Sequence, residues 1–257
     1  MRRVVLRGIG FLFLGIALFS LFAATLIFAL PGAKSSLLEI ANDEYAPRMV
    51  PIMLAHEPQL STLTYENTAA YCRHDGPGVS QEFAGISDEY VCSLIQNNYV
   101  SNTEELRLRL ARALISIKAD GITADYGMQI ASFQSYLLPL AAACVISAFL
   151  SFTFVYFGSK GMLGLAFSLA SAAAAISFII FLISVLSFFL LPPYLISMAK
   201  GNASTPFEMD LISASQDLVA QVVGEVFLIP MALFGILSIA SGLSASSAYY
   251  YLTGTKN

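Results

Sequence analysis

Charged residues are missing from four long stretches of this chain. No Asp, Glu, Lys or Arg occurs in 8–33, 126–159, 161–199 or 226–255. Each stretch is mostly apolar and exceeds the roughly 20 residues that a helix needs to cross a bilayer. A soluble domain carries about 25% charged residues, whereas this chain carries 12%. We therefore predict an all-α integral membrane protein with four transmembrane helices.

Acidic residues are absent from one predicted side of the membrane. All 17 Asp and Glu residues lie in two blocks, 34–125 and 200–225. Lys and Arg in short segments near membrane ends favour the cytoplasm. The basic residues outside the two blocks therefore predict a cytoplasmic N-terminus, turn and C-terminus; they are Arg2, Arg3, Arg7, Lys160 and Lys256. The two acidic blocks are expected to face outward from the cell membrane.

The predicted boundaries follow from these runs. The apolar run after residue 7 is longer than the roughly 7 to 15 residues of a signal peptide, so a retained anchor is favoured over a cleaved signal. The segments are 1–7 (cytoplasmic N-terminus), 8–32 (first span), 33–130 (extracytoplasmic helical domain), 131–157 (second span), 158–161 (cytoplasmic turn), 162–191 (third span), 192–226 (extracytoplasmic loop with a short amphipathic helix), 227–251 (fourth span) and 252–257 (cytoplasmic tail).

Catalytic motifs are also lacking. The chain has two histidines, no G-x-S-x-G motif and no Gly-rich phosphate loop, so neither a nucleophile nor a base stands out. His56 and Glu57 resemble the start of a metalloprotease helix, but Leu60 replaces the second histidine and Pro58 interrupts the helix. We assign no catalytic, cofactor or metal residue and expect no nucleic-acid partner. The absence of ionisable groups deep in the spans argues against a proton-coupled transporter.

Only three cysteines are present. Cys72 and Cys92 lie in the predicted outer domain, where thiols tend to oxidise, so we predict a disulfide between them. The alternative is a metal site formed by Cys72, His74, Asp75 and Cys92, although the usual repeated zinc-ligand spacing is missing. Cys144 falls within the second span, where it is expected to be a small apolar filler.

The outer domain is predicted to be helical. Ser87 is placed to cap a helix, and a further helix begins near Asn102 and is expected to end at Gly121. Earlier helices are predicted over 36–45 and 61–71, with prolines breaking the chain between them. The helix after Asn102 carries an apolar stripe that packs in a core or binds a partner. A candidate interaction surface on it comprises Leu106, Arg107, Arg109, Leu110, Arg112 and Ile117.

The second outer block carries its own start signals. Pro192 and Pro193 are expected to end the third span. Thr205 and Glu208 then form a predicted capping box, followed by an amphipathic helix that continues to the fourth span. Asn202 begins an Asn-Ala-Ser sequon and is a candidate glycosylation site.

The layout of the chain suggests a function only in outline. One span, an outer domain and three more spans resemble, in topology, the permeases that work with cytoplasmic ATPases in lipoprotein export and cell division. The leading hypothesis is a non-enzymatic protein that acts by binding, as a subunit of a membrane assembly or an envelope or adhesion component. Besides the lipid bilayer, its expected partner is a membrane protein or a second copy of the chain. A permease-type transporter subunit is the alternative, and a membrane-embedded enzyme comes third.

Overall fold

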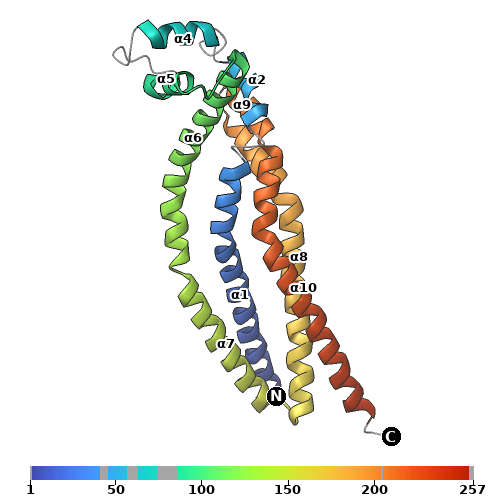
Figure 1. Ribbon diagram of the computed structural model, residues 1–257. Coiled ribbons are helices and arrows are strands. Elements are labelled where there is room, and N and C mark those ends of the chain that lie inside the picture. Colours follow the sequence, from blue (N-terminus) through green and yellow to red (C-terminus); the bar gives the residue numbers. More distant parts are fainter. Residues whose placement is uncertain (1, 41–45, 57–62, 75–85, 204, 255–257) are drawn as a thin grey trace. The chain divides into compact units, whose positions relative to one another are not determined.

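The structure is a computed structural model that describes residues 2–40, 46–56, 63–74, 86–203 and 205–254 (Figure 1). Within these ranges the regular secondary structure is helical, which confirms the all-α prediction for this part of the chain. The helices are α1 (Arg2–Ile40), α2 (Ala46–His56), α4 (Tyr65–His74), α5 (Asp88–Gln96), α6 (Thr103–Gln134), α7 (Leu137–Gly158), α8 (Met162–Asn202), α9 (Pro206–Ala214) and α10 (Gln216–Gly254).

Four helical segments are long and apolar enough to cross a membrane. In the most apolar window of each, at most 22% of the residues are buried by the protein itself. Apolar side chains with this much exposed surface would be unfavourable in water, whereas contact with lipid tails carries no such cost. The chain is therefore a membrane protein by length and composition. The segments are Arg2–Gly32, Ala131–Gly158, Met162–Asn202 and Gln216–Thr253.

The chain divides into two compact units, which we describe separately. The span unit comprises Met1–Ala33, Met128–Leu191 and Val223–Asn257, and the head unit comprises Lys34–Gly127 and Pro192–Val222. All the acidic residues except Glu225 thus belong to the head unit. The five basic residues outside the two acidic blocks belong to the span unit.

In the span unit, α1 and α7 approach closely through glycine. A Cβ added to Gly10 on α1 would lie 2.5 Å from Cγ2 of Val155 and 3.1 Å from the carbonyl oxygen of Ser151 on α7. Seven residues after Ser151 on α7, Gly158 lies against Arg7, whose Nε donates a hydrogen bond of 3.0 Å to the Gly158 carbonyl. Gly10 thus contacts the earlier residues of α7, whereas Arg7, which precedes Gly10 on α1, contacts the later Gly158. The two helices are therefore antiparallel.

The other close pair is α8 and α10, which lie side by side (Figure 1). The hydroxyl of Ser238 on α10 donates to the carbonyl of Ala174 on α8 at 3.3 Å. Gly235 faces the ring of Phe181, which again gives an antiparallel register. Gly242, further along α10, makes no such approach, because a Cβ there would meet nothing within 4 Å.

Two helices continue past residues that were predicted to end them. α8 runs through Pro192 and Pro193 to Asn202, and α6 runs through Gly121 to Gln134. Proline has a helical φ and frees only the carbonyl four residues earlier, while glycine in a helix costs about 1 kcal/mol relative to alanine. Both residues weaken a helix, and neither is sufficient to stop one of this length.

The head helices differ from the predicted ones in three other places. α2 contains Pro47 in its first turn and Pro51 inside, where we expected prolines to break the chain. α1 continues to Ile40, and residues 41–45 lie outside the described ranges. The predicted helix after Thr205 is interrupted at Ser215, whose backbone N–H donates to the carbonyls of Leu211 and Ile212 at the end of α9. Proline in a first helical turn removes a donor that has no acceptor there.

We predict that Gly10→Ala destabilises the span unit. The new methyl group would collide with Val155 and with α7 backbone, and such overpacking costs about 1 to 3 kcal/mol. Gly15→Ala is the matched control, because its Cβ would meet nothing within 4 Å, and alanine favours the helix. Thermal unfolding in detergent, followed by circular dichroism, checks this. If Gly10→Ala is as stable as Gly15→Ala, the close α1–α7 contact is wrong.

Candidate functional site

The head unit has a hydrophobic core formed by α4, α5 and α6. The apolar stripe predicted on the helix after Asn102 lies inside this core, because Leu106 and Leu110 are fully buried. Val91 and Leu94, which lie about one helical turn apart on α5, are buried in the same cluster. The cluster comprises Leu63, Ala69, Cys72, Ile86, Val91, Leu94, Ile95, Val100, Leu106, Leu110, Ala111 and Leu114.

A disulfide joins α4 to α5 within this core. The sulfur atoms of Cys72 and Cys92 are 2.04 Å apart, as expected for the predicted pair. Beside the bridge, the Tyr71 hydroxyl donates a hydrogen bond of 3.0 Å to the Asp88 carboxylate. The bridge commits both thiols, so they are not available as metal ligands. The third cysteine, Cys144, is free and half-buried in α7.

Side chains cap the two helices that follow. The Ser87 hydroxyl accepts from the backbone N–H of Tyr90 at the start of α5. At the start of α6, Asn102 Oδ1 accepts from the backbone N–H of Glu105 at 2.8 Å. The predicted polar start signals thus act as caps, each satisfying a donor that has no acceptor within its helix.

Glu105 completes the start of α6. Its carboxylate accepts hydrogen bonds from the backbone N–H of Ser101 at 3.0 Å and from the Ser101 hydroxyl at 2.9 Å. These two bonds, with a smaller contribution from the positive charge of Arg109, lower the pKa of the Glu105 carboxyl below its ordinary value. The lowered pKa keeps the carboxyl group ionised at more acidic pH than an ordinary glutamate, and the negative charge suits a helix N-terminus.

The candidate interaction surface on α6 is only partly exposed. Leu106 and Leu110 pack in the core and cannot contribute to it, which corrects that part of the prediction. Arg107 is half-buried and its Nε donates to the carbonyl of Leu63 at 3.1 Å. Arg112 is also half-buried. The side chain of Ile117 lies outside the described ones.

Arg109 is the exposed member of that predicted set. Its guanidinium carbon lies 5.9 Å from the centroid of the Tyr99 ring, in the turn between α5 and α6. The Tyr99 side chain is 56% exposed. A guanidinium at this distance from an aromatic face is held there by a cation–π attraction. Tyr and Arg are also the residue types enriched where proteins bind each other.

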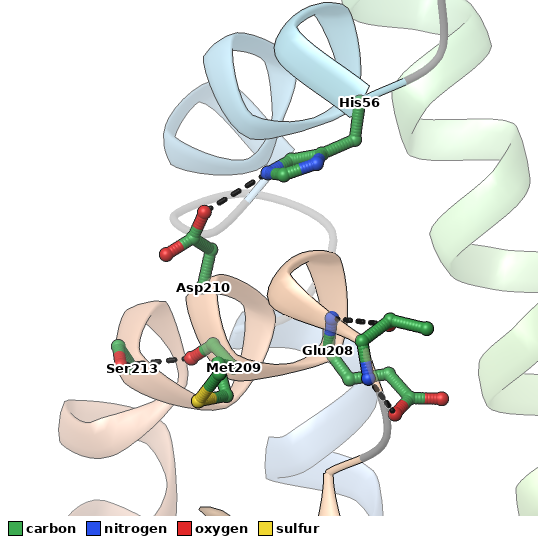
Figure 2. Close-up of polar contacts among 6 residues, drawn as sticks. His56, Glu208, Met209, Asp210 and Ser213 are labelled. Carbon is green, nitrogen blue, oxygen red and sulfur yellow. Dashed lines mark hydrogen bonds and ion pairs between the residues drawn. The ribbon is translucent and has the colours of Figure 1, made fainter.

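Two side-chain contacts join α2 to the second block of the head. Figure 2 shows His56 at the end of α2 pointing toward Asp210 on α9, with Nε2 2.9 Å from the carboxylate. Arg48, earlier on α2, lies 2.9 Å from the carboxylate of Asp217. Asp217 lies in the first turn of α10, shortly after α9 ends, and we call the two contacts together the α2–α9 seam. Both are partly solvated, so each contributes little stability on its own.

The predicted capping box holds the start of α9. The Thr205 hydroxyl accepts from the backbone N–H of Glu208, and the Glu208 carboxylate accepts from the backbone N–H of Thr205, both at 3.2 Å (Figure 2). Pro206 occupies the first turn. The capping box fixes the first residue of α9, a helix of nine residues, and so fixes the position of Asp210 one turn later.

Other predicted site residues contribute less. Asn202 is exposed at the end of α8, whereas Ser204 of the same sequon lies outside the described ranges. The ring of His74 is likewise outside the described side chains, so the structure does not join it to a site. Among the described residues, no three His, Cys, Asp or Glu side chains are placed to hold a metal ion.

Sequence reasoning missed the α2–α9 seam. Its partners are 169 and 154 residues apart, and α2 itself was not expected. The opposite charges of Arg48 and Asp217 are the only signal present, and many other pairs in the head satisfy the same criterion.

The chain matches no known family model, and neither a curated protein nor a solved structure is significantly similar to it. The function must therefore be argued from its own residues.

We predict that the Cys72–Cys92 bridge stabilises the head. In the chain-entropy model, a loop of this length contributes on the order of 3 kcal/mol. The double replacement Cys72→Ser with Cys92→Ser should therefore lower the unfolding temperature of the oxidised protein, and Cys144→Ser should leave it nearly unchanged. Unfolding with and without reductant measures both effects. Two thiols in the head that react with a maleimide under non-reducing conditions would contradict the bridge.

Proposed function

We propose that this chain is a four-pass membrane protein whose head unit lies outside the cytoplasm and binds a partner within a membrane assembly. The N-terminus, the turn after α7 and the C-terminus lie on the cytoplasmic side in this proposal. The binding role is non-enzymatic, and the partner is another membrane protein or a second copy of the chain.

The α2–α9 seam is the observation that carries this proposal. It joins 34–127 to 192–222, the two segments that connect the spans on the acid-rich side. Segments that fold into one unit must lie on the same side of a bilayer. The opposite connection is short and basic, and basic residues favour the cytoplasm. Folding requires the two acid-rich segments to share a side, and the basic residues on the opposite side favour assigning that shared side to the outside.

The use of reactive side chains in the head favours binding over catalysis. His56 contacts Asp210, Tyr71 donates to Asp88, and the two head cysteines form a bridge. These groups hold helices to each other. A catalytic acid, base or nucleophile would instead need to reach a substrate.

Tyr99 and Arg109 form the surface that we assign to partner binding. They are exposed, they contact each other, and they are supported by the capped start of α6. A ring and a guanidinium held in this way lose little freedom when a partner covers them. This pair replaces the buried leucines of the predicted surface.

A permease-type subunit remains the second candidate. Its layout of spans is the same, with the head between the first and second spans. A permease must engage an ATPase through cytoplasmic segments, and here the connection between α7 and α8 is limited to residues 159–161. So short a turn gives an ATPase little surface, which is why we rank this candidate lower.

We expect thiol labelling to place the head outside. Glu66→Cys on α4 and Lys160→Cys in the turn, each combined with Cys144→Ser, introduce exposed thiols at the two ends. In intact cells a membrane-impermeant maleimide should label position 66 and should label position 160 only after permeabilisation. Labelling in the reverse order would overturn the orientation and, with it, the proposed binding surface.

We expect a photo-crosslinker at position 99 to capture a discrete partner in native membranes. The matched control is position 136, because Tyr136 and Tyr99 are 57% and 56% exposed but Tyr136 belongs to the span unit. Arg109→Ala should reduce the yield at position 99. A product of twice the chain mass identifies a second copy. Equal yields at both positions, or only uncrosslinked chain, would contradict binding through this surface.

A further inference from the structure

Basic residues from two distant segments gather at one end of the span unit. Arg7 Nε donates to the carbonyl of Gly158, and a Cβ on Gly158 would lie 3.0 Å from the carbonyl oxygen of Arg3. The turn that carries Lys160 therefore lies against the first turns of α1. Arg2, Arg3 and Lys160 are exposed and Arg7 is half-buried. We call these four residues the basic end.

No acidic residue balances the basic end within its own segments. The chain contains no Asp or Glu in 1–38, in 126–207 or after residue 225. The aromatic contact between Phe167 and Tyr249 brings the last turns of α10 close to the start of α8, and these turns are also free of acids. A field of one sign is therefore left at this end of the span unit.

The start of α8 adds donors of the same kind. The first backbone N–H groups of a helix have no acceptor within it and carry partial positive charge. Gly161 precedes α8 with a φ of 91°, and it has no side chain with which to cap those groups. Guanidinium, ammonium and backbone donors thus occur together, as in anion sites at helix starts.

Apolar side chains begin directly beside these donors. On the last turn of α7, Phe157 is 65% exposed, and at the start of α8, Met162 is 69% exposed. A free phosphate ion gains no favourable contact from exposed apolar side chains. A lipid has both a headgroup for the donors and tails for the apolar side chains.

We propose that the basic end binds the phosphate of an anionic lipid headgroup, with the lipid tails lying along α7 and α8. The site consists of Arg2, Arg3, Lys160 and the start of α8, and Arg7 holds the turn in place through Gly158. The proposal does not depend on the partner bound by the head. It holds for either orientation of the chain, since lipid phosphates line both surfaces of a bilayer.

The test compares two lipids on the purified full-length protein. Native mass spectrometry in detergent measures how much phosphatidylglycerol binds relative to phosphatidylcholine, which has the same tails but no net charge. The unaltered chain should prefer phosphatidylglycerol. Arg3→Gln with Lys160→Gln should lower this preference by roughly five-fold for each charge removed, because each Lys or Arg near a membrane surface contributes about that factor.

The matched control removes the same number of charges from the head. Arg73→Gln with Lys200→Gln leaves the basic end intact and should keep the preference of the unaltered chain. Both double variants replace side chains that are exposed or half-buried, and thermal unfolding establishes that each is folded. Should the first double variant unfold, Arg2→Gln alone provides the comparison, with a loss of up to about five-fold.

Three results would overturn the proposal. The first is an unaltered chain that binds both lipids equally, and the second is an equal loss of preference in both double variants. The third is displacement of phosphatidylglycerol by millimolar inorganic phosphate, which would identify a free anion as the ligand.

Discussion

The absence of water from the bilayer interior is the constraint on which the rest of this structure depends. Backbone N–H and C=O groups there can pair only within the protein, so each span is a helix. Charges are excluded from the same region, and the chain keeps all 17 acids and 13 basic residues outside four neutral runs. Once those runs are set, the remaining sequence can fold only at their ends. Composition therefore determines which parts of the chain can meet.

The span unit and the head unit are stabilised by different interactions. In the span unit, helices are surrounded by lipid, which is as apolar as their own side chains, so close backbone approach at Gly10 and Gly158 replaces the hydrophobic effect as the source of packing. In the head unit, water is present and a small core must exclude it. That core is small for an aqueous domain, and a covalent bridge together with capped helices compensates for its size.

Much of this architecture was predictable from local signals. The spans follow from charge-free length, the caps at Ser87 and Thr205 from short polar motifs, and the Cys72–Cys92 pair from the expected compartment. Helix ends were less predictable. Pro193 and Gly121 were interpreted as stops, but a long helix supported by its neighbours tolerates a local cost of about 1 to 3 kcal/mol.

The candidate surface was predicted only in part, for a different reason. An amphipathic stripe indicates that one face is covered, and it does not indicate by what; in the head, α4 and α5 cover Leu106 and Leu110. Arg109 was included because it lies off the stripe, whereas Tyr99 was not, since its position depends on the turn after α5. The α2–α9 seam needed three-dimensional information, because its charges are separated by most of the chain.

The order in which head contacts can form during synthesis follows from their separation along the chain. Cys72 and Cys92 are 20 residues apart, and both leave the ribosome before any residue of α7. Asp217 emerges later by a stretch that takes roughly 6 to 25 s to translate at ordinary rates. In the proposed orientation, with the head outside the cytoplasm, both cysteines are therefore available for oxidation before the seam can close. Until then, α2 has been synthesised but its partners Asp210 and Asp217 have not.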